Sequence, residues 1–171
     1  APLTSLDRWA LVEAARVVAV VTEALEEFDT QAAGKALSTF VDDLSNWYVR
    51  RSRRRFWQGD PAALATLHDC LRTATLLMAP FTPFITDRVW RDLFADTEGV
   101  DSVHLARWPE AGETDTGLTA DVAVVRTLVD LGRSARAESG VRTRQPLRRA
   151  LGSAPRWAQL ADDLKAQFTE E

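Results

Sequence analysis

The sequence predicts an all-α fold: an antiparallel helical bundle of four to five helices, followed by a short strand or extended segment and a helix at the C-terminal end. Two observations carry this prediction. Apolar residues recur at steps of three and four over most of the chain, which is the period of a helix with one buried face. Aspartate, glycine and proline fall between these stretches, at the positions where helices begin and end.

The first two helices are predicted from apolar stripes on either side of a short break. Apolar residues keep the helical period through residues 6–28, and Thr4 or Ser5 stands where a helix N-cap is expected. A second helix is expected to begin after Asp29 or Thr30, which have the same capping chemistry. Because the break is so short, the two helices are expected to lie antiparallel.

The next two helices are bounded by glycine and proline. Gly59 is expected to end the second helix, and Asp60 and Pro61 to begin a third as its cap and its first helical residue. The third helix is expected to end at Pro80 because proline cannot continue the hydrogen-bond ladder. A fourth helix is predicted over residues 84–94.

The remaining residues have a less regular pattern. Residues 95–118 read as a loop with a short extended piece at residues 102–105, and a fifth helix is expected over residues 121–137. A short strand or extended segment within residues 141–151 and a last helix over residues 155–168 complete the prediction.

Length and composition indicate one globular domain with a small appendage. The chain has 171 residues, and we divide it into a helical bundle over residues 1–140 and the truncated start of a C-terminal region over residues 141–171. Its 46% apolar and 27% charged residues are ordinary for a soluble protein. No stretch approaches the roughly 18 apolar residues that a membrane span needs.

The single cysteine bears on the cellular compartment. Cys70 has no second cysteine to pair with, which excludes an internal disulfide and indicates a reducing environment. We therefore expect a cytoplasmic protein. No small-residue cleavage site follows a charged start, so we expect no signal peptide. The chain is also expected to be monomeric. Ala1 in place of methionine suggests a piece of a longer protein.

A run of arginines between aromatic residues is the most informative feature. Five of the six residues at 50–55 are arginine, with Asn-Trp-Tyr shortly before them and Phe-Trp directly after. On a helix, Asn46, Arg50, Arg53 and Trp57 follow at steps of four, three and four and so share one face. Guanidinium groups bind phosphate, aromatic rings stack on unpaired bases, and an amide reads a base edge. This face therefore predicts binding of single-stranded nucleic acid.

The same residues also have a purely structural interpretation. The net charge of −4 and a pI near 5.3 argue against a nucleic-acid partner. Cations stabilise a helix C-terminus, and exposed arginines commonly pair with acids of a neighbouring helix. Trp47, Tyr48 and Phe56 lie close to the apolar stripe and are expected to pack in the core. Spacing alone leaves both interpretations of the arginines open.

No catalytic or metal site is predicted. His68 and Cys70 stand two residues apart, point to different sides of a helix and have no second ligand pair nearby. His104 is expected to make a structural hydrogen bond. The sequence offers no arrangement of serine, histidine and acid, and no glycine-rich phosphate loop.

Four stretches, in order along the chain, resemble one family. The run LSNWYVRRSRRRFW at residues 44–57 closely resembles the segment that marks the anticodon-binding domain of isoleucyl-tRNA synthetases of the eukaryotic-like branch, which are class I enzymes. LDRW at residues 6–9 resembles the start of that domain, and SVHLARWP at residues 102–109 resembles its SVHLxxWP element. The stretch at residues 136–147, which ends in VRTRQPL, resembles its exit into a C-terminal region. The resemblance covers nearly the whole chain.

The resemblance implies a domain that binds the anticodon stem and loop of an isoleucine-accepting tRNA, and neither DNA nor a membrane. Arg51 and Arg55 are alternatively internal salt-bridge partners. The tRNA-binding residues that we infer are Asn46, Arg50, Arg53, Arg54 and Trp57, with Arg142 and Arg144 as backbone contacts.

The resemblance also implies a longer parent, an isoleucine–tRNA ligase whose separate catalytic domain uses ATP and Mg²⁺ to aminoacylate tRNA in translation. The HIGH and KMSKS signatures of that domain do not occur in this chain. We therefore expect this piece to be non-catalytic and without a cofactor, to contact the rest of the parent, and to leave the family's zinc, where present, to a region outside it. The alternatives are the equivalent domain of a valyl-tRNA synthetase and a non-catalytic helical protein-interaction bundle.

Overall fold

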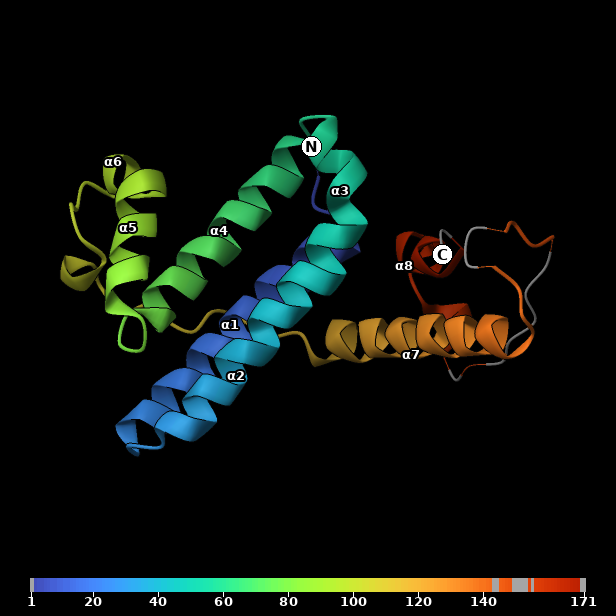
Figure 1. Cartoon of the computed structure of the whole chain (residues 1–171), viewed down its shortest axis with the longest axis horizontal. Coiled ribbons are helices and arrows are strands. Elements are labelled where there is room, and N and C mark those ends of the chain that lie inside the picture. Colours follow the sequence, from blue (N-terminus) through green and yellow to red (C-terminus); the bar gives the residue numbers. More distant parts are fainter. Residues whose placement is uncertain (1, 143–144, 149–153, 155, 170–171) are drawn as a thin grey trace.

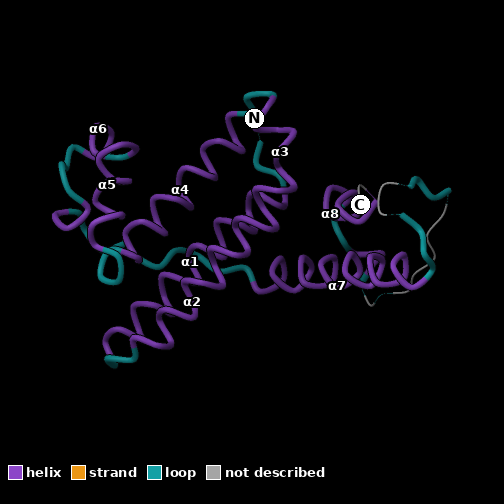
Figure 2. Tube along the Cα trace, viewed as in Figure 1, coloured by secondary structure: helices purple, strands orange, loops and turns teal. Residues whose placement is uncertain are grey.

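The computed structural model describes residues 2–142, 145–148, 154 and 156–169. Within these residues every regular element is a helix and none is a strand, which confirms the predicted all-α class (Figure 1; Figure 2). In chain order the elements are α1 (Ser5–Glu26), α2 (Thr30–Asp43), the π-helix η1 (Leu44–Val49), α3 (Arg50–Trp57), α4 (Pro61–Met78), α5 (Pro83–Leu93), α6 (Ala95–Glu98), the 3-10 helix η2 (Val103–Leu105), α7 (Thr116–Glu138), the 3-10 helix η3 (Trp157–Gln159) and α8 (Asp162–Thr169).

Three long rods form the centre of the molecule. Helix α1 runs beside the continuous rod of α2, η1 and α3, and α4 returns in the opposite direction to that rod (Figure 1). Val17, Val21 and Leu77 are fully buried between them. Helix α7 leaves this body at a steep angle and carries α8, yet Val125 and Leu164 belong to the same apolar core as α1. The boundary near residue 140 stays a prediction.

The helix starts follow the capping residues in the sequence. Thr4 and Asp7 form a capping box, in which the Thr4 hydroxyl accepts from the Asp7 amide at 3.2 Å and an Asp7 carboxylate oxygen accepts from the Thr4 amide at 2.9 Å. Asp29 caps α2 through the Ala32 amide. Asp60 caps α4, which begins with proline. These three boundaries confirm the first, second and third predicted helices.

A smaller apolar cluster holds the α5 end of the molecule. Trp90 of α5 and Phe94, which directly follows α5, are buried against Leu76, Ala79 and Val103. The Trp90 indole nitrogen donates to the backbone oxygen of Val100 at 2.8 Å, which fixes the loop after α6. This cluster makes α5 and η2 one unit at the end of α4.

The structure differs from the prediction in the less regular segments. Residues 102–105 form a 3-10 turn in place of an extended piece, because the Ser102 hydroxyl accepts from the His104 amide and so caps it. Helix α7 begins at Thr116, five residues before the expected start, because Asp115 caps it. The last predicted helix is divided into η3 and α8.

The hydropathy of the described helices bears on membrane insertion. Among the residues that the structure describes, none of the helices combines the length and the apolar character that crossing a membrane requires.

Phe28 occupies a backbone position that normally belongs to glycine. It follows α1 with a φ of 60°, and the Asp29 amide donates to the Ala24 oxygen at 2.7 Å in a Schellman turn. The ring is almost fully exposed, so the position carries left-handed strain without visible packing in return. Gly59, after α3, fills the equivalent position with a φ of 68°.

We therefore predict that Phe28→Gly raises the free energy of unfolding by about 1 kcal/mol, because glycine adopts positive φ without steric cost. Gly59→Ala makes the reverse change at the equivalent position and is expected to lower the free energy of unfolding by about 1 kcal/mol. Because no atom lies within 4 Å of the added Cβ, this loss comes from the backbone conformation alone. Urea unfolding followed by circular dichroism measures both. A less stable Phe28→Gly variant would show that the ring makes a stabilising contact.

Candidate nucleic-acid interface

The π-helix η1 sets which residues of α3 face outward. An α-helix has 3.6 residues per turn, so positions four apart drift around its axis by about 40° at each step. Phe40, Leu44, Tyr48 and Ser52 are nevertheless all buried at a constant step of four, because the wider π turn takes up the extra residue. The buried stripe of the rod thus continues straight from α2 into α3.

The opposite side of the rod is the exposed stripe, which we define as Asn46, Arg50, Arg53, Arg54 and Trp57. All five are exposed, and the Trp57 indole is 82% exposed. Within the described part of the chain, none of the three arginines forms an ion pair. The five predicted side chains on this rod therefore lie on one open surface.

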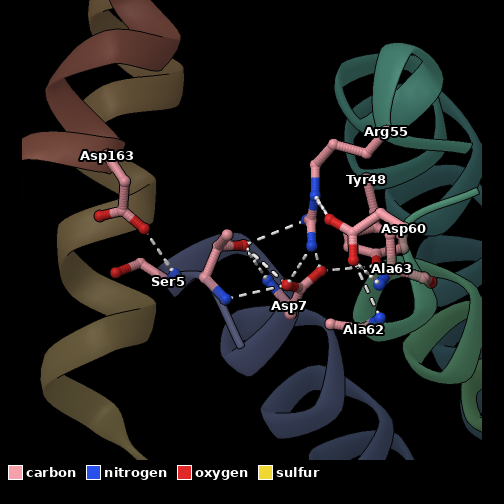
Figure 3. Close-up of polar contacts among 9 residues, drawn as sticks. Ser5, Asp7, Tyr48, Arg55, Asp60, Ala62, Ala63 and Asp163 are labelled. Carbon is pink, nitrogen blue, oxygen red and sulfur yellow. Dashed lines mark hydrogen bonds and ion pairs between the residues drawn. The ribbon is translucent and has the colours of Figure 1, made fainter. Parts of the chain in front are cut away.

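Arg55 points the other way and is the centre of a buried polar network (Figure 3). Its two terminal nitrogens donate to the two carboxylate oxygens of Asp7, each at 2.8 Å, in the paired geometry that makes guanidinium–carboxylate contacts strong. Its Nε donates to Asp60 at 2.8 Å. The Tyr48 hydroxyl donates to Asp7 at 2.8 Å. Arg55 is an internal ion-pair partner, which confirms that alternative for this residue.

The network determines the charge of its members. Burial alone would raise the pKa of Asp7, but hydrogen bonds from Arg55, the Thr4 backbone and Tyr48 outweigh it and hold the pKa below its ordinary value. The Asp7 contact in turn raises the pKa of Arg55. Burial and the adjacent Asp7 carboxylate raise the pKa of Tyr48. At neutral pH the site holds a carboxylate, a guanidinium and a neutral phenol.

The network also joins three parts of the chain. Asp7 lies in the first turn of α1, Arg55 near the end of α3, and Asp60 caps α4 through the Ala62 amide at 2.9 Å. Next to it, the Ser5 amide donates to Asp163 of α8 at 2.6 Å (Figure 3). The start of α1 therefore fixes the C-terminal end of α3 and the N-terminal end of α8.

Arg51 is also used internally. Its guanidinium stacks 3.9 Å from the centre of the Trp47 ring and donates to the Gln167 backbone oxygen of α8 at 2.6 Å. Trp47 and Tyr48 are buried, as predicted for core residues. Arg126 of α7 also lies over Trp47, at 5.4 Å. Of the five arginines at residues 50–55, Arg51 and Arg55 therefore have structural contacts, and the other three face outward.

The remaining predicted residues lie elsewhere or outside the described residues. Arg142 is exposed beyond the end of α7, and Arg144 lies outside the described residues. Cys70 is buried with its pKa raised to about 12 by burial, and His68 packs edge-on against Phe94. His104 contacts the Pro83 carbonyl oxygen at 3.2 Å.

Sequence reasoning missed the role of Asp7. The spacing of Thr4 and Asp7 has the pattern of a capping box, which places Asp7 in the first turn of α1. Nothing in the local sequence indicates that Arg55, 48 positions later, completes the site.

An all-helical chain with guanidinium groups and an indole on one open helix face has the features of a nucleic-acid-binding module. Residues 7–151 match the model of one family, the anticodon-binding domain of tRNA ligases. The chain belongs to this family.

Among the curated relatives, three isoleucine–tRNA ligases match most of this chain. An isoleucine–tRNA ligase of Streptomyces avermitilis is 61% identical over 170 residues, and one of Streptomyces coelicolor is 59% identical over 170 residues; each match covers 97% of this chain and 16% of the relative. An isoleucine–tRNA ligase of Thermus thermophilus is 46% identical over 160 residues, which cover 88% of this chain and 15% of the relative. The chain spans about one sixth of the length of these relatives.

The Arg55 network makes a stability prediction. Arg55→Met keeps the length of the side chain but leaves the buried Asp7 carboxylate without its cation, so we expect a loss of about 3 kcal/mol in the free energy of unfolding. Arg53→Met, two residues earlier on the exposed stripe, is expected to change it by less than about 0.5 kcal/mol. Denaturant unfolding at pH 7 compares the two. Equal effects would contradict the division of the arginines into internal and outward groups.

Proposed function

We propose that this chain is the anticodon-binding domain of an isoleucine–tRNA ligase and that it holds the anticodon stem and loop of an isoleucine-accepting tRNA on the exposed stripe. The family supports tRNA as the partner. The relatives named above support isoleucine rather than valine as the amino acid of the parent enzyme. The outward position of three arginines without ion-pair partners in the described residues is the observation that supports this surface most directly.

The distribution of charge answers the objection raised by the acidic pI. The chain has a net charge of −4, yet residues 44–59 contain five arginines and no acid. The rest of the chain therefore carries −4 − 5 = −9. Residues 133–149, with six arginines and one acid, are a second basic stretch. Anionic RNA is attracted to these two stretches and repelled by the acidic remainder of the chain.

The three kinds of side chain in the exposed stripe have separate tasks. From Asn46 to Trp57 the stripe is about 16 Å long, at 1.5 Å per residue. Arg50, Arg53 and Arg54 bind phosphates along it. Trp57 offers a ring face for an unpaired base, and Asn46 offers an amide for a base edge. Single-stranded loop nucleotides match this set better than a regular duplex, whose bases are stacked on each other.

The chemistry of the parent enzyme takes place outside this chain. In this proposal a separate catalytic domain uses ATP and Mg²⁺ to aminoacylate the tRNA in the cytoplasm, and the present domain places the tRNA by its anticodon end. Its own residues contribute binding and orientation only.

Removing two outward cations tests the proposal. We expect Arg50→Gln with Arg53→Gln to weaken binding of an isoleucine-accepting tRNA transcript at least tenfold at low salt, and to reduce the slope of log Kd against log salt by about 1.5, because two phosphate contacts are lost. Fluorescence anisotropy over a salt series gives both numbers.

The control is Arg88→Gln with Arg91→Gln. These two arginines are also exposed and three residues apart, but lie on α5 and pair with Asp92 and Asp87. We expect unchanged tRNA binding. If both double variants bind tRNA as tightly as the unaltered chain does, Arg50 and Arg53 belong to a solvated face with no role in tRNA binding. That result would favour the alternative of a helical protein-interaction bundle.

Trp57 tests the stacking contact separately. Trp57→Ala removes an exposed ring, so the free energy of unfolding is expected to stay within about 0.5 kcal/mol, while tRNA binding weakens about tenfold or more through loss of base stacking. Phe84→Ala is the matched control, since Phe84 is also a highly exposed ring, on α5. Anisotropy titrations that show no difference between the two variants would exclude stacking on Trp57.

A further inference from the structure

A second exposed surface lies on the other wing of the molecule. Phe84 and Ile85, in the first turn of α5, are 91% and 59% exposed, and Leu105 of η2 is 75% exposed. We call these three residues the apolar patch. Figure 1 shows α5 on the opposite side of the central helices from α7, away from α3. Exposed apolar groups that gather in one place mark contact surfaces in soluble proteins.

The patch is held in place by its surroundings. The His104 ring nitrogen lies 3.2 Å from the Pro83 oxygen, which ties η2 to the first turn of α5. The Ser102 hydroxyl donates to Asp87 at 2.5 Å, and Val103, which lies between Ser102 and His104 in the chain, is buried. The three side chains are therefore presented to solvent by a fixed scaffold, which is the preorganisation that a docking surface needs.

Charge distinguishes a protein partner from RNA at this patch. Residues 81–105 contain two arginines and five acids, a net charge of 2 − 5 = −3. Both arginines are paired, Arg88 with Asp92 and Arg91 with Asp87, each at 2.8 Å. A nucleic-acid surface needs free cations near its aromatic rings. The patch has the composition of a protein contact: it is apolar, and both arginines of its polar rim are paired with acids.

We propose that Phe84, Ile85 and Leu105 dock this domain onto an apolar surface in another part of the same parent ligase. The inference rests on the proposed function, because it takes a longer ligase chain as the partner. Its support is that the relatives are about six times longer than the region they share with this chain. The domain then presents α3 to tRNA on one side and rests on the parent enzyme through its α5 side.

Hydroxyl-radical footprinting of the parent ligase and of the 171-residue chain, both without tRNA, tests the docking. A dose reporter added to both samples makes the rates comparable. We expect Phe84 to react about tenfold more slowly in the parent, in proportion to the loss of its exposed surface. In a parent carrying Ile85→Ser and Leu105→Ser, which cannot form the apolar contact, Phe84 is expected to regain the rate seen in the isolated chain.

The remaining outcomes each overturn the docking. Equal Phe84 rates in the parent and the isolated chain show an open patch. Protection of Phe84 only after tRNA is added shows an RNA contact. Protection that rises with the concentration of the isolated chain, together with a doubled mass by light scattering, shows a contact between copies. The oxidation rate of Trp57, measured in the same footprinting experiment, tests the proposed function separately. We expect tRNA to protect Trp57 from oxidation whether or not Phe84 is docked.

Discussion

The contact between Arg55 and Asp7 determines how the helices of this domain meet. A buried carboxylate needs a cation and several donors, and Asp7 takes them from α3, from Tyr48 and from its own cap residue Thr4. Because Arg55 also binds the cap of α4, the turn between α3 and α4 cannot shift without breaking the contact at the start of α1. Apolar packing along the rods tolerates substitutions of similar volume, whereas this paired geometry requires these particular groups at these positions.

The same contact explains why one arginine run serves two purposes. Neighbouring helix positions point about 100° apart, so a cationic run on a helix cannot be wholly inside or wholly outside. Arg51 and Arg55 fix α3 to α8 and α1, while Arg50, Arg53 and Arg54 project from a helix that is already held. A binding face on a fixed helix loses less conformational entropy on binding than one on a flexible segment. In the proposed tRNA contact, the structural arginines would thus make the outward ones more effective.

The sequence predicted much of the fold because its boundaries are marked locally. Thr4, Asp29 and Asp60 have cap chemistry, and Pro61 and Gly59 sit where helices begin and end, so long helices followed directly from the pattern. The division of the arginines could not be predicted, since the partners of Arg55 and Arg51 lie 48 and 116 positions away. The π turn has no marker residue. The open apolar patch was hidden because Phe84 and Ile85 fit the apolar stripe of any helix.

The π turn also decides where the rod can change in length. Because η1 takes up one extra residue, deleting a residue from it would restore an ordinary α-helix and leave Ser52 on the buried side and Arg53 on the outward side. A deletion at the start of α3 has no wide turn to absorb it, so every later side chain would move about 100° around the rod. A loss of one residue is therefore absorbed within η1, whereas the same loss in α3 would turn the outward arginines after it toward the core.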